Sequence, residues 1–296
     1  MDISLISQYF FHAIIMGIIY CLMAIGITFI YSIMKMINWS MGEFYMIGSY
    51  IQFFLLTSVI GYENWFFGIP LTIFIVFLIG MIYYRVLLKP MYVRGIERKD
   101  DYITIITLAS VILFRNIMVV FYGPYIYSPK DYFPPVNFGT LPINGSKLVA
   151  AIGTAIIVGI FYCGIKKTWI GRAFQATAQN RVGVQIAGIN PYRIDELSFG
   201  IGCALAAASG ALLAPVFMVF PTNGAITTIK GFTIIILGGL GSIIGSVIGA
   251  MLLGFVEVFG SAFISASYRD IYGFILLLLV LAFKPKGLFG ERERLV

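Results

Sequence analysis

Blocks of roughly twenty apolar residues follow one another along almost the whole chain, and this feature restricts the possible folds more than any other. A helix that crosses the hydrocarbon core of a bilayer needs about 20 such residues. A membrane β-barrel would show short segments of alternating polarity instead. The blocks therefore predict an all-α fold, that of a polytopic helical membrane protein.

The composition agrees with this pattern. Of the 296 residues, 60% are hydrophobic and 11% are charged, and the mean hydropathy is +0.96, which is too apolar for a soluble domain. We predict one transmembrane domain over residues 1–296. About eight membrane-spanning helices are expected near residues 9–33, 43–60, 64–86, 102–122, 147–165, 194–220, 244–264 and 268–284.

The segment 226–243 has a different character. Its sequence "ITTIKGFTIIILGGLGSI" holds apolar residues for roughly half a bilayer before a cluster of glycines. Such a segment predicts a short or re-entrant helix that returns the chain to the inner face of the membrane.

Basic residues predict the orientation, because short loops rich in Lys and Arg stay in the cytoplasm. Three regions carry 14 of the 20 basic residues, which places the Pro-rich loop 123–146 and the N-terminus outside and the C-terminus inside. Charges spread over loops between spans do not indicate nucleic-acid binding. The 14 basic residues of the three regions are Arg85, Lys89, Arg94, Arg98 and Lys99; Lys166, Lys167, Arg172, Arg181 and Arg193; and Lys284, Lys286, Arg292 and Arg294.

Signatures of enzymes are scarce in this chain. The single histidine, His12, lies in the first apolar block without Cys, Asp or Glu beside it, so neither a metal site nor a catalytic residue is expected. The sequence contains no Gly-rich loop followed by Lys-Ser/Thr, so it has no P-loop of its own. Any work driven by ATP requires a partner.

Glycines recur at every fourth position in "GGLGSIIGSVIGAMLLG". Gly241, Gly245 and Gly249 predict a helix face small enough for close helix contact, and a role in a translocation path is the alternative. A dinucleotide-binding fingerprint is not formed, since Ile244 stands where its third glycine is required.

Several polar residues at membrane depth are candidates for a path or a gate. Asn38, Ser40 and Gly42 interrupt the apolar pattern between the first two blocks, and Glu43 closes this stretch. Interrupted helices of transporters often shape a site or a gate. The alternative is a polar turn in which Asn38 and Ser40 satisfy helix ends. Glu257, deep in its block, is either a buried structural partner or a path-lining residue. Arg115, about 20 Å along its helix, either extends to the outer headgroups or faces a cavity or partner.

Three stretches together carry a resemblance to a known family. The first, "GIIYCLMAIGITFIYSIMKMINWSMGEFYMIGSY", contains an Asn-x-x-x-Gly-Glu turn, and the third is "ILGGLGSIIGSVIGAMLLGFVE" followed by "LAFKPKGLFG". They are similar to the first and last spans of the permease subunits of branched-chain amino acid ABC transporters, the LivH type. At Met41 the family commonly has histidine.

The second stretch, "GRAFQATAQNRVGVQIAGINPYRIDELSF", resembles the cytoplasmic loop, about 166–193 here, by which such permeases dock onto their ATPase. The Glu-Ala-Ala portion of many ABC permeases is absent, so the Gly-Ile-Asn end carries most of the inference, and a plain basic connector is the alternative. The docking residues that the resemblance implies are Gly171, Arg172, Ala173, Ala187, Gly188, Ile189 and Asn190.

The resemblance implies an ABC importer permease subunit in a bacterial cytoplasmic (inner) membrane. Its expected partners are ABC ATPase subunits, a second related permease subunit, an external substrate-binding protein and membrane lipid, with no nucleic acid. The chain itself is expected to be no enzyme and to hold no cofactor, since ATP and Mg would be bound by the ATPases. Leucine, isoleucine and valine are the expected substrates.

Other functions stay open at this level. Permeases for urea or short amides are closely similar, because apolar spans do not encode the ligand. A secondary amino acid transporter driven by an ion gradient would use Glu43 and Glu257 as coupling carboxylates. A membrane scaffold would use the small-residue faces for packing alone.

Overall fold

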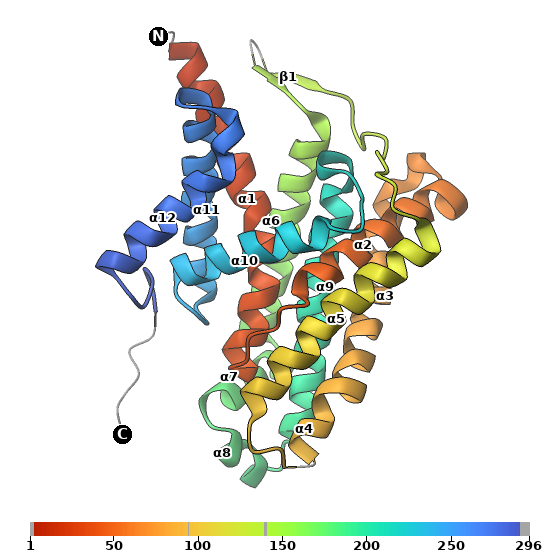
Figure 1. Cartoon of the computed structure of the whole chain (residues 1–296), viewed down its shortest axis with the longest axis vertical. Coiled ribbons are helices and arrows are strands. Elements are labelled where there is room, and N and C mark those ends of the chain that lie inside the picture. Colours follow the sequence, from red (N-terminus) through yellow and green to blue (C-terminus); the bar gives the residue numbers. More distant parts are fainter. Residues whose placement is uncertain (1–2, 94, 139–140, 291–296) are drawn as a thin grey trace.

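The computed structural model describes residues 3–93, 95–138 and 141–290, so Arg94, Arg292 and Arg294 and part of the loop 123–146 lie outside the described residues. Among the described residues, eight helical segments are long and apolar enough to cross a membrane, which confirms the predicted polytopic helical fold (Figure 1). Their main helices are α1 (Ile3–Met34), α2 (Met41–Leu55), α3 (Trp65–Tyr83), α5 (Lys99–Tyr122), α6 (Gly145–Lys167), α9 (Pro191–Phe217), α11 (Ile243–Phe263) and α12 (Arg269–Phe283).

Short helical turns of other types lengthen three of these spans. A π-helical turn (Leu56–Ile60) extends α2, and a second one (Tyr84–Leu88) joins α3 to α4 (Lys89–Val93). Short 3-10 turns (Tyr62–Asn64 and Ala266–Tyr268) precede α3 and α12. With these turns included, every predicted span coincides with an observed one to within several residues.

The loop between α5 and α6 contains a small hairpin that the sequence pattern did not predict. Its strands β1 (Val136–Phe138) and β2 (Leu141–Ile143) pair antiparallel, with Val136 opposite Ile143. Hydrogen bonds tie the loop to α9 and to the chain that follows it: the Tyr132 hydroxyl donates to the Ala211 carbonyl at 2.6 Å, and the backbones of Tyr127 and Val219 pair through two bonds of 2.8 and 2.9 Å.

Helices α1 and α9 form the centre of the molecule. The most apolar stretch of each is 89% buried, whereas the corresponding stretches of α5, α6 and α12 are 11–17% buried. Small residues allow the close packing, since a Cβ on Gly26 of α1 would lie 2.8 Å from the Gly202 carbonyl of α9, and one on Gly210 would run into the Tyr45 carbonyl of α2. Close backbone approach is what drives helix association in lipid.

Helix α10 (Asn223–Gly238) is too short to span the bilayer, and it runs across the bundle rather than along it (Figure 1). This agrees with the short helix predicted for 226–243. A Cβ on Gly249 of α11 would lie 2.8 Å from the Ile234 carbonyl of α10, and one on Gly245 would run into the Gly238 carbonyl. These two glycines therefore allow α11 to pack on α10.

The predicted glycine face is wrong at Gly241. This residue precedes α11 and has a φ of +87°, so it lies in the turn between α10 and α11. The side chain of Ser242 caps α11 by accepting from the Gly245 amide at 3.0 Å. Glycines four residues apart thus occur on both sides of the start of α11, and only Gly245 and Gly249 share the helix face.

The chain between α1 and α2 is non-helical over residues 35–38 and climbs from the lower end of α1 to the middle of the bundle, where α2 begins beside α10 (Figure 1). The two helices cross at glycines, because a Cβ on Gly42 would run into the Gly224 carbonyl. The Gly42 amide also donates to the Thr228 hydroxyl at 3.1 Å. The start of α2 is therefore held against α10 at membrane depth.

Replacing Gly42 by Ala should destabilise the protein, because the added methyl group meets a backbone carbonyl that cannot rotate away. Overpacking of this kind costs about 1–3 kcal/mol. The matched control is Gly159→Ala on α6, where nothing lies within 4 Å of an added Cβ. Thermal unfolding in detergent should show a lower midpoint for Gly42→Ala only, and equal midpoints for both variants would contradict the tight crossing.

Candidate functional site

The loop between α6 and α9 folds into two short helices at the lower end of the molecule, α7 (Trp169–Gln179) and α8 (Arg181–Ile186) (Figure 1). Side chains cap both helices, as the Thr168 hydroxyl accepts from the Gly171 amide at 3.0 Å and the Asn180 amide oxygen accepts from the Gly183 amide at 2.9 Å. The loop is therefore folded into two capped helices.

Ion pairs attach this loop and the end of the third span to the first turns of α9. Arg181 of α8 pairs with Asp195, which is fully buried, and Arg85 pairs with Glu196 at 2.6 Å. Partial burial lowers the pKa of Arg181, but the Asp195 carboxylate and the Tyr92 and Tyr84 side chains together raise it, so this pKa lies above its usual value and the guanidinium stays charged. The Arg181 guanidinium also lies 5.4 Å from the centre of the Tyr92 ring.

The predicted docking residues divide into two groups. Gly171 and Ala173 are buried and hold the loop together, since a Cβ on Gly171 would run into the Ile165 carbonyl. Arg172, Ala187, Gly188 and Asn190 are exposed and Ile189 is half-buried. Gly188 has a φ of +81°, which glycine adopts without strain, and Asn190 caps α9 by accepting from the Tyr192 amide at 3.0 Å.

Two exposed apolar side chains beside this turn were missed by sequence reasoning. Val182 is 65% exposed and Ile186 is 84% exposed. They lie four residues apart on α8, so they share one face of that helix. Their spacing was the available signal, but a six-residue helix is too short for a recognisable periodicity. The end of α8 thus presents an apolar patch next to Gly188.

The interrupted segment before α2 brings together three of the predicted path residues. The Asn38 amide oxygen accepts from the amide and the hydroxyl of Ser40 at 2.9 and 2.7 Å, which is the polar-turn arrangement. Glu43 follows in the first turn of α2, where it is 2% exposed. Its Oε2 atom is buried without a hydrogen-bond partner among the described residues.

Glu257 does not lie with these residues but in a separate network of charges. It accepts hydrogen bonds from the Tyr20 hydroxyl at 2.6 Å, from Lys230 at 2.6 Å and from Arg269 at 2.8 Å. Lys230 also pairs with Asp270 at 2.8 Å. The network joins α1, α10, α11 and α12, which favours the structural alternative for Glu257. Its partners stand far away in sequence, so no helical spacing could have revealed them.

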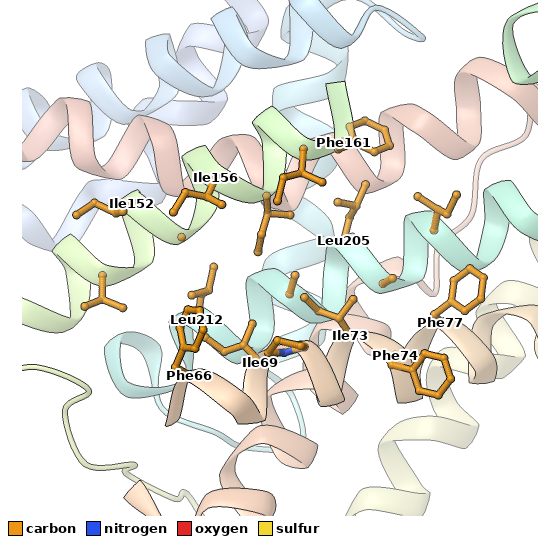
Figure 2. Close-up of a pocket in the computed structure, with 18 of the residues that line it drawn as sticks. Phe66, Ile69, Ile73, Phe74, Phe77, Ile152, Ile156, Phe161, Leu205 and Leu212 are labelled. Atoms are coloured by element: carbon orange, nitrogen blue, oxygen red, sulfur yellow. The ribbon is translucent and has the colours of Figure 1, made fainter. Parts of the chain in front are cut away.

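A wide apolar groove of about 690 Å³ opens between α3, α6 and α9. Aliphatic and aromatic side chains point into it, among them Ile69, Ile156 and Leu212 (Figure 2). Ligand sites for polar molecules need a few convergent polar groups. No charged side chain lines this groove among the described residues, so it is no candidate for binding a charged solute.

Comparison with known proteins gives a consistent result over nearly the whole chain. Residues 9–282 match the family described as branched-chain amino acid transport system / permease component. The chain is 33% identical to the high-affinity branched-chain amino acid transport system permease protein LivH of Escherichia coli (strain K12), over 97% of this chain and 96% of that protein. The permease protein BraD of Pseudomonas aeruginosa is also 33% identical, with the same coverage.

A solved structure is similar in fold. The chain aligns with a chain of PsaBC from Streptococcus pneumoniae in complex with Fab, with a TM-score of 0.51, 11% sequence identity and coverage of 94% of this chain and 92% of that one. At this identity the similarity concerns the arrangement of helices.

Removing the Glu257 carboxylate should strongly destabilise the protein, because Lys230 and Arg269 would lose their shared partner. Breaking a buried ion pair costs about 3–5 kcal/mol. The control is Asp101→Ala, which breaks a pair with Arg98 whose side chains are 62% and 86% exposed and is worth less than about 1 kcal/mol. Thermal unfolding in detergent should separate Glu257→Ala from this control, and similar midpoints would show that the network contributes little.

Proposed function

The chain belongs to the family of permease components of branched-chain amino acid transport systems, and from this premise we propose that it is the membrane-spanning permease subunit of an ATP-driven importer of aliphatic amino acids. The observation that carries the proposal is the 33% identity to LivH over 97% of the chain. The ordered surface made by α7 and α8 supports it, because a chain without a P-loop needs a surface through which an ATPase can act.

The coupling surface proposed here is the exposed patch formed by Val182, Ile186, Ala187 and Gly188. ATPase subunits that close on ATP would push this patch. The push would pass through the Arg181–Asp195 ion pair into the first turn of α9. Since α9 is central and packs closely on α1 and α2, its displacement would move the inner ends of the spans as a rigid group and alternate the access to a path.

The same proposal determines which ends of the spans face each side of the membrane. The ends of the spans that carry α7 and α8 would face the cytoplasm of a bacterium, and the N-terminus and the loop with β1 and β2 would face outward. An external binding protein would deliver the amino acid to the outer side. A second related permease subunit would complete the path, and ATP and Mg would be held by the ATPases.

Ion-coupled transport is disfavoured by the surroundings of Glu257. A coupling carboxylate must exchange its cation or proton during each cycle. Glu257 instead accepts from the cationic Lys230 and Arg269 and from Tyr20. Protonating it would leave two cations close together in a partly buried site.

The proposal is tested by purifying the tagged chain from its native membrane in mild detergent with gentle crosslinking, followed by mass spectrometry. We expect P-loop ATPases, a second permease and a soluble binding protein, whose ligand can then be assayed with leucine, isoleucine and valine. Recovery of the chain alone, or only with itself, would contradict the proposed assembly.

Gly188→Asp should abolish uptake while leaving membrane insertion intact, because it places a charge and bulk at the turn that the ATPase would contact. Gly95→Asp is the matched control: both glycines are exposed, have positive φ values of +81° and +62°, and have nothing within 4 Å of an added Cβ. Initial rates of leucine uptake and the amount of bound ATPase should fall for Gly188→Asp alone. Normal uptake by this variant would remove the loop from the mechanism.

A further inference from the structure

Arg115 occupies an unusual position for a charged residue in a membrane span. It lies on α5, seven residues or about 10 Å before the helix ends at Tyr122. Its side chain is exposed, and so are those of Asn116 and Ile112. None of the described residues forms an ion pair or a hydrogen bond with the Arg115 side chain. The cation therefore lies on the surface of the helix bundle, in the half of α5 that is nearer its C-terminal end.

Contact with lipid tails does not account for this position. A guanidinium in the hydrocarbon region is costly unless it meets water, a phosphate or another polar group. Helical side chains lean toward the N-terminus of their helix. On α5 this direction leads from Arg115 toward Lys99, away from the nearer outer headgroups. The Cα–Cβ bond of Arg115 thus leans toward the interior of the membrane, where a water-filled path would solvate the guanidinium.

Glu43 is the carboxylate that belongs to the same region. It is 2% exposed, and its Oε2 atom lacks a partner among the described residues. Arg115 is close enough to attract it electrostatically. Their aromatic neighbours also touch, since the rings of Phe44, which follows Glu43, and Phe114, which precedes Arg115, have centres 5.6 Å apart. A buried carboxylate with an unpartnered oxygen beside an unpaired cation is an expensive arrangement that neither packing nor the coupling loop explains.

The break between α1 and α2 is what brings Glu43 to this depth. A continuous helix would place it elsewhere, whereas the non-helical segment climbs to the middle of the bundle before α2 starts (Figure 1). At the crossing with α10 the carboxylate lies against Gly224, because a Cβ on Gly224 would lie 2.9 Å from Glu43 Oε1. Irregular backbone at membrane depth is tolerated where it is buried in protein or lines a water-filled cavity.

We propose that Arg115 and Glu43 form the polar wall of the substrate path, where Arg115 binds the α-carboxylate of the transported amino acid and Glu43 its α-ammonium. A guanidinium suits a carboxylate because its planar donors match the two oxygens. The exposed aliphatic side chains beside Arg115, Ile112 among them, suit an aliphatic substituent. This inference rests on the proposed function and adds the residues that would contact the substrate.

The first experiment measures leucine uptake and ATP hydrolysis by the complete transporter in proteoliposomes. We expect Arg115→Gln and Glu43→Gln each to lower uptake at least 10-fold while leucine-loaded binding protein still stimulates hydrolysis. Arg115→Lys should retain more uptake than Arg115→Gln, since it keeps the charge. The control is Arg98→Gln, which removes a cation from the exposed start of α5 and should leave uptake unchanged.

The outcomes separate this inference from the proposed function. No leucine uptake by the wild-type complex would contradict the proposed function itself. Normal uptake by Arg115→Gln in a complex that does transport leucine would overturn only the inference. Loss of both uptake and stimulated hydrolysis in an assembled variant would also overturn it, in favour of a contact between subunits.

A second measurement does not depend on uptake. Arg115→Cys should react with a charged, membrane-impermeant thiol reagent, because the path contains water. Ile160→Cys on α6 is the matched control, as Ile160 is 68% exposed on a span whose surface is apolar, and the unmodified chain reports any reaction of its own three cysteines. An unreactive Arg115→Cys thiol would place the residue against lipid, with a headgroup phosphate as its partner, and would overturn the proposal.

Discussion

Close packing of backbones along α9 is the constraint on which the rest of the molecule depends. In lipid there is no hydrophobic force between helices, so association relies on small residues that let main chains touch. Gly202 and Gly210 supply such contacts to α1 and α2, and any larger side chain there would collide with a neighbouring backbone or side chain. Because α9 also begins at the Asn190 cap of the loop that holds α7 and α8, the helix that holds the core together is the one that would receive the proposed push from an ATPase.

Charges at membrane depth serve two different purposes in this structure. Glu257 gathers donors from three other helices, and a carboxylate shared by Lys230 and Arg269 fixes how α10, α11 and α12 meet. Glu43 and Arg115 show the opposite pattern, since each keeps a polar atom or a charge without a partner among the described residues. The first arrangement stabilises a fold, and the second is what a site that awaits a zwitterion requires.

The sequence was sufficient to predict the number and type of the spans, because hydropathy reports directly on burial in lipid. It predicted the short helix at 226–243. Gly241 was wrongly assigned to a helix face, since glycines at every fourth position do not show where a helix starts. The sequence could not predict the partners of Glu257, because Lys230 reaches it only through the path of α10 across the bundle. The apolar patch of Val182 and Ile186 was missed because a six-residue helix is too short to show a recognisable periodicity.

We propose that this permease is driven by ATP through the loop that holds α7 and α8. The most direct measurement is leucine uptake by the purified assembly in proteoliposomes, with ATP present or absent on the side of the ATPases and with an ionophore that removes ion gradients. We predict uptake that requires ATP hydrolysis and persists with the ionophore. Uptake that continues without ATP and collapses when the gradients are removed would contradict the account.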